Sequence, residues 1–194
     1  MKEDSTKETI LQMAFKLFSE DAYNDVTMEE VAKKAGISKG GLFYHFPSKY
    51  ELAKGALFYG FEEWTKKVFP KVLTLPSADK KLKAFIGHSL NLVYENPKIP
   101  RFFLEVYEKS LEKGNDSKEW VEFYSEYLEL FESLFKELEV PNPRLRSLLL
   151  GAILDGIALY LPMAPKVLKE NPNLMEMGAI KEEIYEIFVS RSEE

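Results

Sequence analysis

The chain has 194 residues, 45% hydrophobic and 30% charged, which is enough apolar material for a buried core and excludes disorder by composition. It has no cysteine, so disulfides and thiolate metal sites are excluded, and its net charge of −6 argues against unselective coating of nucleic acid. No apolar run follows Met1, so we expect no signal peptide and a cytoplasmic protein.

Residues 5–21 are predicted to form the first helix. Its apolar residues recur at helical spacing and would fill one broad face: Ile10, Leu11, Ala14, Phe15, Leu17 and Phe18. This face is suited to packing behind the two helices that follow.

Residues 27–36 carry the signals of a short second helix. Thr27 and Glu30 form a capping box, in which the hydroxyl accepts from a free backbone N–H and the carboxylate reaches back to the cap. Apolar residues then follow at helical spacing. Gly36 is expected to end the helix, because a residue at that point usually needs a positive φ and only glycine takes it without strain.

Ser38 is placed to cap another short helix, which must end before Pro47 because the proline ring disfavours helical backbone at Phe46. Ser48 and Glu51 form a second capping box, which opens a longer helix. Two short helices joined by a tight glycine turn are typical of a helix-turn-helix. The sequence therefore predicts this motif at residues 27–46.

The second helix of such a motif enters the DNA major groove with its N-terminal residues leading. Leu42 and Phe46 are expected to pack inward. Each glycine at the start of this helix costs roughly 1 kcal/mol against alanine in a helix interior, so we interpret the pair as a place where the backbone approaches a partner closely. The alternative is that both glycines lie in a turn. The groove-facing candidates are Lys39, Gly40, Gly41, Phe43, Tyr44 and His45.

Residues 37–52 resemble the signature of the TetR family of transcriptional repressors, and the similarity covers a little over a quarter of the chain. The resemblance implies an all-helical homodimer with an N-terminal three-helix DNA-binding domain, residues 1–50. It also implies a larger C-terminal helical domain, residues 51–194, that binds a small-molecule inducer and dimerises. We therefore expect a repressor that binds a pseudo-palindromic operator as a dimer and is released by the inducer.

The resemblance also assigns residues, and three positions depart from the family pattern. Phe43 stands where tyrosine is common, Gly41 replaces a small polar residue, and Ala22 stands where a helix-ending glycine is common. These departures remove individual contacts and leave the motif intact. The residues that match family positions touching operator DNA are Thr27, Ser38, Lys39, Gly40, Tyr44, His45 and Lys49.

Charge is unevenly distributed along the N-terminal part. Residues 1–30 hold three lysines and eight acidic residues, a net charge of −5, whereas residues 31–55 hold five lysines and one glutamate, a net charge of +4. The basic stretch coincides with the predicted helix-turn-helix, as contact with phosphate requires. Solvated surface lysines are the alternative explanation.

The helix that opens at Ser48 is predicted to continue to Val68 and to end at Pro70. Its N-terminus carries Lys49 and is suited to binding a phosphate. No linker interrupts this helix, so we expect one rigid element to belong to both domains and to transmit a signal between them.

Only helices are predicted beyond Pro76. They cover about 79–94, a segment that includes 102–111, a long segment that ends near 138, and about 145–161 and 180–189. The helix at 145–161 is the most apolar and must therefore be buried, although it is too short and too charged to span a bilayer.

The middle helices are rich in aromatic residues, and an apolar cavity with a few polar groups is the usual form of a small-molecule site. We expect an inducer with a large apolar part. Core packing is the alternative for most of these aromatics, and Asp155 on a buried helix needs either a partner or a cationic ligand. The candidate ligand-binding residues are Phe61, Trp64, Phe85, His88, Phe103, Tyr107, Tyr124, Tyr127, Phe131 and Asp155.

The last two apolar helices are most easily buried across a two-fold axis, as a four-helix bundle between two copies of the chain. Burial inside one protomer is the alternative. The candidate dimer-interface residues are Leu148, Ala152, Ile153, Gly156, Ile180, Ile184, Ile187 and Phe188.

Two other classes of function are alternatives. An enzyme is disfavoured because only His45 and His88 could serve as imidazole bases, and no phosphate loop, dinucleotide fingerprint or metal motif occurs; we expect no catalytic residue, metal or cofactor. A helical partner or membrane-surface module would use the helix at 145–161. Such a module would stay monomeric and bind vesicles, whereas a stable dimer indifferent to lipid would favour the regulator.

Overall fold

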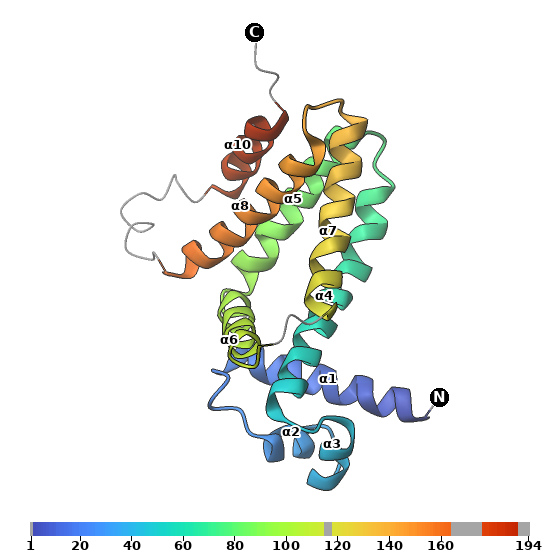
Figure 1. Cartoon of the computed structure of the whole chain (residues 1–194), viewed down its shortest axis with the longest axis vertical. Helices are drawn as coiled ribbons and strands as arrows, with labels where there is room; N and C mark the ends of the chain where they lie inside the picture. The colour runs from blue at the N-terminus through green and yellow to red at the C-terminus, as the bar shows by residue number, and fades with distance from the viewer. Residues whose placement is uncertain (1, 115–117, 164–175, 190–194) are drawn as a thin grey trace. The chain divides into compact units, whose positions relative to one another are not determined.

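The structure is a computed structural model of the chain, and it describes residues 2–114, 118–163 and 176–189. Every regular element within these ranges is a helix, as predicted (Figure 1). None of the described helices is both long enough and apolar enough to cross a membrane. The helices are α1 Lys2–Glu20, α2 Met28–Lys34, α3 Lys39–His45, α4 Lys49–Leu73, α5 Ala78–Glu95, α6 Ile99–Glu112, α7 Lys118–Glu137, α8 Pro143–Met163 and α10 Met177–Val189.

The chain packs as two compact units. The N-terminal unit comprises residues 1–66 and 98–116, and the C-terminal unit comprises residues 67–97 and 117–194. This packing differs from the predicted division after residue 50, because most of α4 and all of α6 pack with the first three helices. The predicted boundary separates a DNA-binding domain from a ligand-binding domain, and this functional division stays a prediction.

The core of the N-terminal unit joins α1 to α6 through stacked aromatic rings. The ring of Phe18 stacks on Phe102 at 5.1 Å between centroids and on Tyr23 at 5.8 Å. The predicted inward face of α1 is buried at Ile10, Ala14, Leu17 and Phe18, whereas Leu11 and Phe15 are half-buried. Helix α2 packs on α1 of this core, and α3 packs on α2.

The C-terminal unit is built from α5, α7, α8 and α10 around a second aromatic core. Phe85 of α5 meets Phe131 of α7 edge to face at 5.0 Å, and Phe135 lies 6.0 Å from Phe188 of α10. Leu150 of α8 is fully buried in the same unit. The last helix is thus fixed to the unit by its own apolar face.

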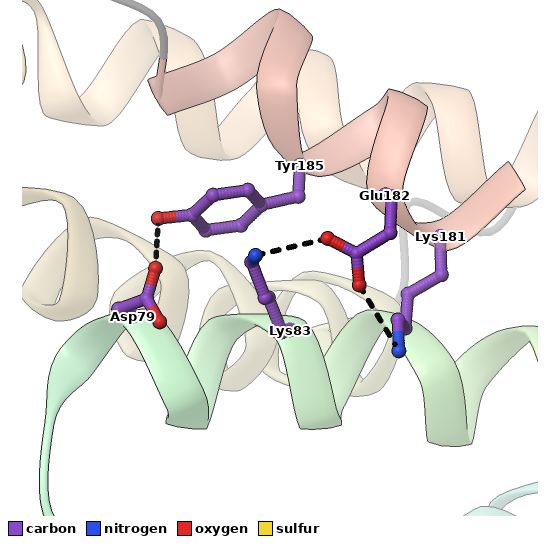
Figure 2. Close-up of polar contacts among 5 residues, drawn as sticks. All are labelled: Asp79, Lys83, Lys181, Glu182 and Tyr185. Atoms are coloured by element: carbon purple, nitrogen blue, oxygen red, sulfur yellow. Dashed lines mark hydrogen bonds and ion pairs between the residues drawn. The ribbon is translucent and has the colours of Figure 1, made fainter. Parts of the chain in front are cut away.

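Polar side chains join α5 to α10 along an antiparallel seam (Figure 2). The hydroxyl of Tyr185 donates to Asp79, and burial together with this bond raises the pKa of the phenol, which keeps it protonated. Nζ of Lys83 lies 2.9 Å from Glu182 and 4.2 Å from the centre of the Tyr185 ring. Lys181 also contacts Glu182, at 3.3 Å. The seam fixes which face of α10 points away from α5.

The predicted end of the fourth helix is wrong. Pro70 lies inside α4, which continues to Leu73. A proline inside a helix removes one backbone hydrogen bond and disfavours the turn before it. Here Val68 and Val72 are both buried on either side of the exposed Pro70, and their burial offsets that cost.

Candidate nucleic-acid interface

The hydroxyl caps and the glycine turn predicted for α2 and α3 are present; of the predicted capping box, the structure shows the bond to the Thr27 hydroxyl. The Thr27 hydroxyl accepts from the backbone N–H of Glu30 at 3.1 Å, and the Ser38 hydroxyl accepts from the N–H of Gly41 at 3.0 Å. Gly36 has a φ of 70°, the left-handed conformation expected at the turn. The predicted helix-turn-helix is therefore formed, and Ser48 caps the start of α4 by accepting from the N–H of Glu51 at 3.2 Å.

Helix α3 has one buried face and one open face. Leu42 and Phe46 are buried, as predicted. Tyr44 is 75% exposed and Phe43 is also exposed, although both are large aromatic side chains. Because these two exposed aromatic side chains are adjacent on the helix that the sequence predicts to enter the major groove, the open face of α3 is a candidate contact surface.

The N-terminal turn of α3 is also open. Gly40 is exposed, and a Cβ added to it would meet no atom within 4 Å. Its φ is not in the left-handed region, so neither space nor backbone conformation within the chain requires glycine there. A Cβ on Gly41 would lie 3.3 Å from the Ser38 hydroxyl, so that glycine is partly explained by the cap.

An open groove runs between α2 and α3 beside these residues. Nζ of Lys39 lies 3.8 Å from a carboxylate oxygen of Glu29, with both side chains well exposed. Such a pair is worth at most about 1 kcal/mol, so Lys39 can exchange this partner for a phosphate at little cost. The groove is lined by Thr27, Met28, Glu29, Glu30, Lys33, Lys39 and Phe43.

Lys49, a predicted phosphate contact, is held by the connection between α1 and α2. Its Nζ donates to the carbonyl oxygen of Asn24 at 3.2 Å and lies 4.7 Å from the centre of the Tyr23 ring. Partial burial lowers the pKa of the Lys49 ammonium, and nearby carboxylates only partly oppose this. DNA binding through Lys49 therefore has to compete with these intramolecular contacts.

All the predicted DNA contacts lie in the N-terminal unit, but their accessibility differs. Thr27 and Ser38 are exposed, and each hydroxyl keeps its proton for donation because it acts as an acceptor in the cap. His45 is half-buried, with its ring 5.3 Å from that of Tyr44. Gly41 and Lys49 are half-buried as well, and the exposed members of the predicted set are Thr27, Ser38, Lys39, Gly40, Phe43 and Tyr44.

The predicted ligand-binding residues are divided between the two units. In the N-terminal unit, Phe61 meets Phe103 at 6.3 Å and Phe103 stacks on Tyr107 at 6.2 Å. Trp64 belongs to the same unit and is half-buried. In the C-terminal unit Phe85 is fully buried against aromatic neighbours. The members in that unit are Phe85, His88, Tyr124, Tyr127, Phe131 and Asp155.

For two of these residues the structure favours the alternative of core packing. Phe85 and Phe131 are core residues that pack on each other, so their burial needs no ligand. Asp155 is exposed on α8 in the single chain, although desolvation raises the pKa of its carboxyl, so the choice between a partner and a cationic ligand stays open. No three histidine, aspartate or glutamate side chains in the described ranges are grouped to hold a metal ion.

The predicted dimer residues fall into an exposed, a half-buried and a buried group. Leu148 and Ile187 are 54% and 55% exposed, and Ala152 and Gly156 are exposed as well. The half-buried members are Ile153 and Ile180. Ile184 and Phe188 are buried, and Phe188 packs on Phe135 of the same chain, which corrects their assignment: they are core residues and offer no surface to a partner.

The sequence prediction missed residues on two helices. On α8, Leu145, Leu149 and Tyr160 are exposed with Leu148; Leu148 and Leu149 follow Leu145 by three and four residues, and Tyr160 lies about three turns further on, so the four mark one apolar face that could have been found. At the start of α6 and within it, Lys98 and Glu105 bind the end of α1 and the connection that follows it. No local pattern marks these two, because their partners lie 78 and 82 residues away.

The chain is similar in sequence to known regulators. The profile of bacterial regulatory proteins, tetR family, matches residues 10–61. The HTH-type transcriptional regulator QacR of Staphylococcus aureus is 25% identical over 131 residues, covering 68% of this chain and 69% of the relative. The uncharacterized HTH-type transcriptional regulator YuxN of Bacillus subtilis is 32% identical over 87 residues, covering 45% of this chain but only 28% of the relative's length.

Solved structures share the fold across nearly the whole chain. A TetR transcription regulator from Haloarcula marismortui has a TM-score of 0.79, with 17% identity over 96% of this chain and all of that one. FadR of Bacillus subtilis, solved in complex with stearoyl-CoA, has a TM-score of 0.65, with 16% identity over 94% of this chain and 97% of that one. At these identities the likeness concerns the fold.

Proposed function

The chain belongs to the TetR family of transcriptional regulators, and on that premise we propose that it is a repressor that binds a pseudo-palindromic operator as a dimer and releases it when a small molecule binds. Each copy would place α3 in the major groove, at half-sites about 34 Å apart. The observation that carries the proposal is the open N-terminal turn of α3, where neither space nor backbone conformation within the chain requires a glycine at position 40.

The proposal separates two kinds of contact. Lys39 would exchange Glu29 for a backbone phosphate, and such contacts position the protein without reading sequence. Tyr44 and the backbone near Gly40 would lie against base edges or sugars, where a side chain at position 40 would hold the helix away. Affinity should therefore fall with rising salt, while selectivity depends on the glycine-led turn.

Gly40→Ala tests the proposal. We expect the variant to be more stable by about 0.5–1 kcal/mol, because alanine is the better helix residue and nothing lies near its Cβ. We expect its dissociation constant for the operator to rise at least tenfold, which corresponds to about 1.4 kcal/mol. The duplex is selected from a random library with the wild-type chain, and binding is measured by fluorescence anisotropy at fixed salt, with urea unfolding alongside.

Opposite changes in stability and affinity would show that Gly40 serves a partner. Val121→Ala on α7 is the matched control, since it truncates an exposed side chain outside the predicted interface and should leave the operator affinity unchanged. Failure of the wild-type chain to select any duplex with salt-sensitive affinity would contradict the proposed function. Unchanged affinity in Gly40→Ala would contradict the role given to the turn.

The inducer is proposed to have a large apolar part, in keeping with the aromatic content of α4 to α7. Stearoyl-CoA, the ligand of the similar FadR structure, is a suitable first probe. Release of the operator by stearoyl-CoA but not by coenzyme A would support recognition of an acyl chain. A co-purified molecule seen by native mass spectrometry would identify the ligand directly.

We also propose that the chain catalyses no reaction. His45 lies on α3 and His88 on α5, and neither is needed as an acid or base by the regulator proposed here. Turnover that His88→Ala abolishes would contradict this part of the proposal.

A further inference from the structure

The connection between α1 and α2, residues 21–27, leads directly into the cap of α2. Its backbone is bound by side chains from α6. The N–H of Tyr23 donates to Oε2 of Glu105 at 2.8 Å. Nζ of Lys98 donates at 2.7 Å to the carbonyl oxygen of Glu20, the last residue of α1. These two bonds fix the point at which the chain leaves α1 and turns towards α2.

The Glu105 carboxylate is itself held in place. Nε of Arg101 donates to its other oxygen, Oε1, at 3.0 Å. Phe102, the neighbour of Arg101, stacks on Phe18, and Val106, the neighbour of Glu105, is fully buried. Glu105 therefore acts from a helix whose own position is set by core packing, and its carboxylate has little freedom to leave the Tyr23 amide.

The same connection is also bound by a side chain of α4. Lys49 donates to the carbonyl oxygen of Asn24 and covers the ring of Tyr23. Residues 21–27 are thus held between α6 and the start of α4, and they end at Thr27, the cap of α2. A shift of this connection would move α2, and with it the turn that presents α3.

We propose that Glu105, assisted by Lys98, is a positioning residue for the DNA-binding helices. Its carboxylate fixes the connection between α1 and α2 by accepting a hydrogen bond from the Tyr23 backbone N–H. This inference rests on the proposed function. A carboxylate that accepts from a backbone N–H forms a charge-assisted bond, stronger than one between neutral groups. Its loss leaves the binding-competent arrangement of α2 and α3 populated for a smaller fraction of the time, and apparent affinity falls by that fraction.

The variant Glu105→Ala tests the assignment with two measurements. We expect hydrogen exchange at the Tyr23 amide to accelerate at least tenfold, because its acceptor is gone. We expect the dissociation constant for the selected duplex to rise about tenfold, with the same dependence on salt, since no phosphate contact is removed. Glu105→Gln keeps a carbonyl oxygen as acceptor, so it should keep most of the protection of the Tyr23 amide and most of the operator affinity. Lys98→Met should weaken binding in the same direction.

The matched control is Glu108→Ala, which removes an exposed carboxylate from the same helix. It should leave the Tyr23 exchange rate and the operator affinity unchanged. Affinity that stays at the wild-type value in Glu105→Ala, or exchange that does not change, would overturn the inference alone. A wild-type chain that selects no duplex would instead overturn the proposed function and this inference with it. Equal loss in Glu105→Gln and Glu105→Ala would also count against the assignment.

Discussion

Gly60→Ala is expected to lower the free energy of unfolding by about 2 kcal/mol. A Cβ on Gly60 of α4 would lie 2.1 Å from Cε2 of Phe15 on α1, and two further ring atoms would be 2.5 Å away. No pair of carbon atoms tolerates such an approach, so the ring or the helix must move. Overpacking of this kind costs typically 1–3 kcal/mol, which exceeds the gain of about 1 kcal/mol from replacing a helical glycine.

The Phe15 ring has limited room to yield, since it lies 6.4 Å from the ring of Phe102, which also stacks on Phe18. The close approach of α1 and α4 therefore depends on a glycine at position 60. Thermal unfolding monitored by circular dichroism would measure the loss, which for a chain of this size is roughly 2–4 °C per kcal/mol.

A double-mutant cycle identifies the cause. In a Phe15→Leu background the ring is absent, so Gly60→Ala should be less harmful or stabilising. Gly40→Ala, which introduces the same methyl group where nothing lies near, is the control for helix propensity. The explanation would be wrong if Gly60→Ala destabilised the chain equally with and without the ring.

Local interactions were the part of the fold that could be predicted from sequence. The caps at Thr27, Ser38 and Ser48 join residues only three positions apart, and all three hydrogen bonds are present. The conformation of Gly36 follows from the same short-range logic. These interactions determine the helix-turn-helix, so the candidate site was found from the sequence before any tertiary contact was known.

Tertiary context determined what the sequence could not. Pro70 was expected to end α4, but burial of Val68 and Val72 keeps the helix intact. The bond between Glu105 and the Tyr23 amide joins positions 82 residues apart, and an isolated glutamate on an amphipathic helix carries no signal of it. Helical periodicity predicts on which face of a helix a residue lies, but it does not predict the distant residue that it contacts.

The C-terminal helices illustrate the same limit. Periodicity placed Ile184 and Ile187 together in a predicted interface, yet Ile184 is buried against the chain and Ile187 is exposed. The seam between α5 and α10 determines which of the two is buried, because Tyr185 and Glu182 hold one side of α10 on α5 (Figure 2). The apolar surface left uncovered is mainly on α8, where Leu145, Leu148, Leu149 and Tyr160 are exposed.

Leu148→Glu is therefore expected to convert the proposed dimer to a monomer. Leu148 lies in the N-terminal half of the exposed face of α8, the face that the proposed two-fold axis would bring against the partner. The proposed interface would then bury one glutamate from each copy. Desolvation of the two carboxylates and the repulsion between them would both oppose association. Native mass spectrometry and sedimentation should report the mass of one chain.

The same change should reduce operator affinity by about 100-fold or more, because a monomer loses the second half-site and with it the gain from bivalent binding. Val121→Glu is the matched control: Val121 is 63% exposed on α7 and lies outside the predicted interface, so it should leave both mass and affinity unchanged. A Leu148→Glu chain that remains dimeric would place the interface elsewhere. A wild-type chain that is monomeric and binds lipid vesicles would favour the membrane-surface module instead, since the exposed face of α8 would then serve a bilayer.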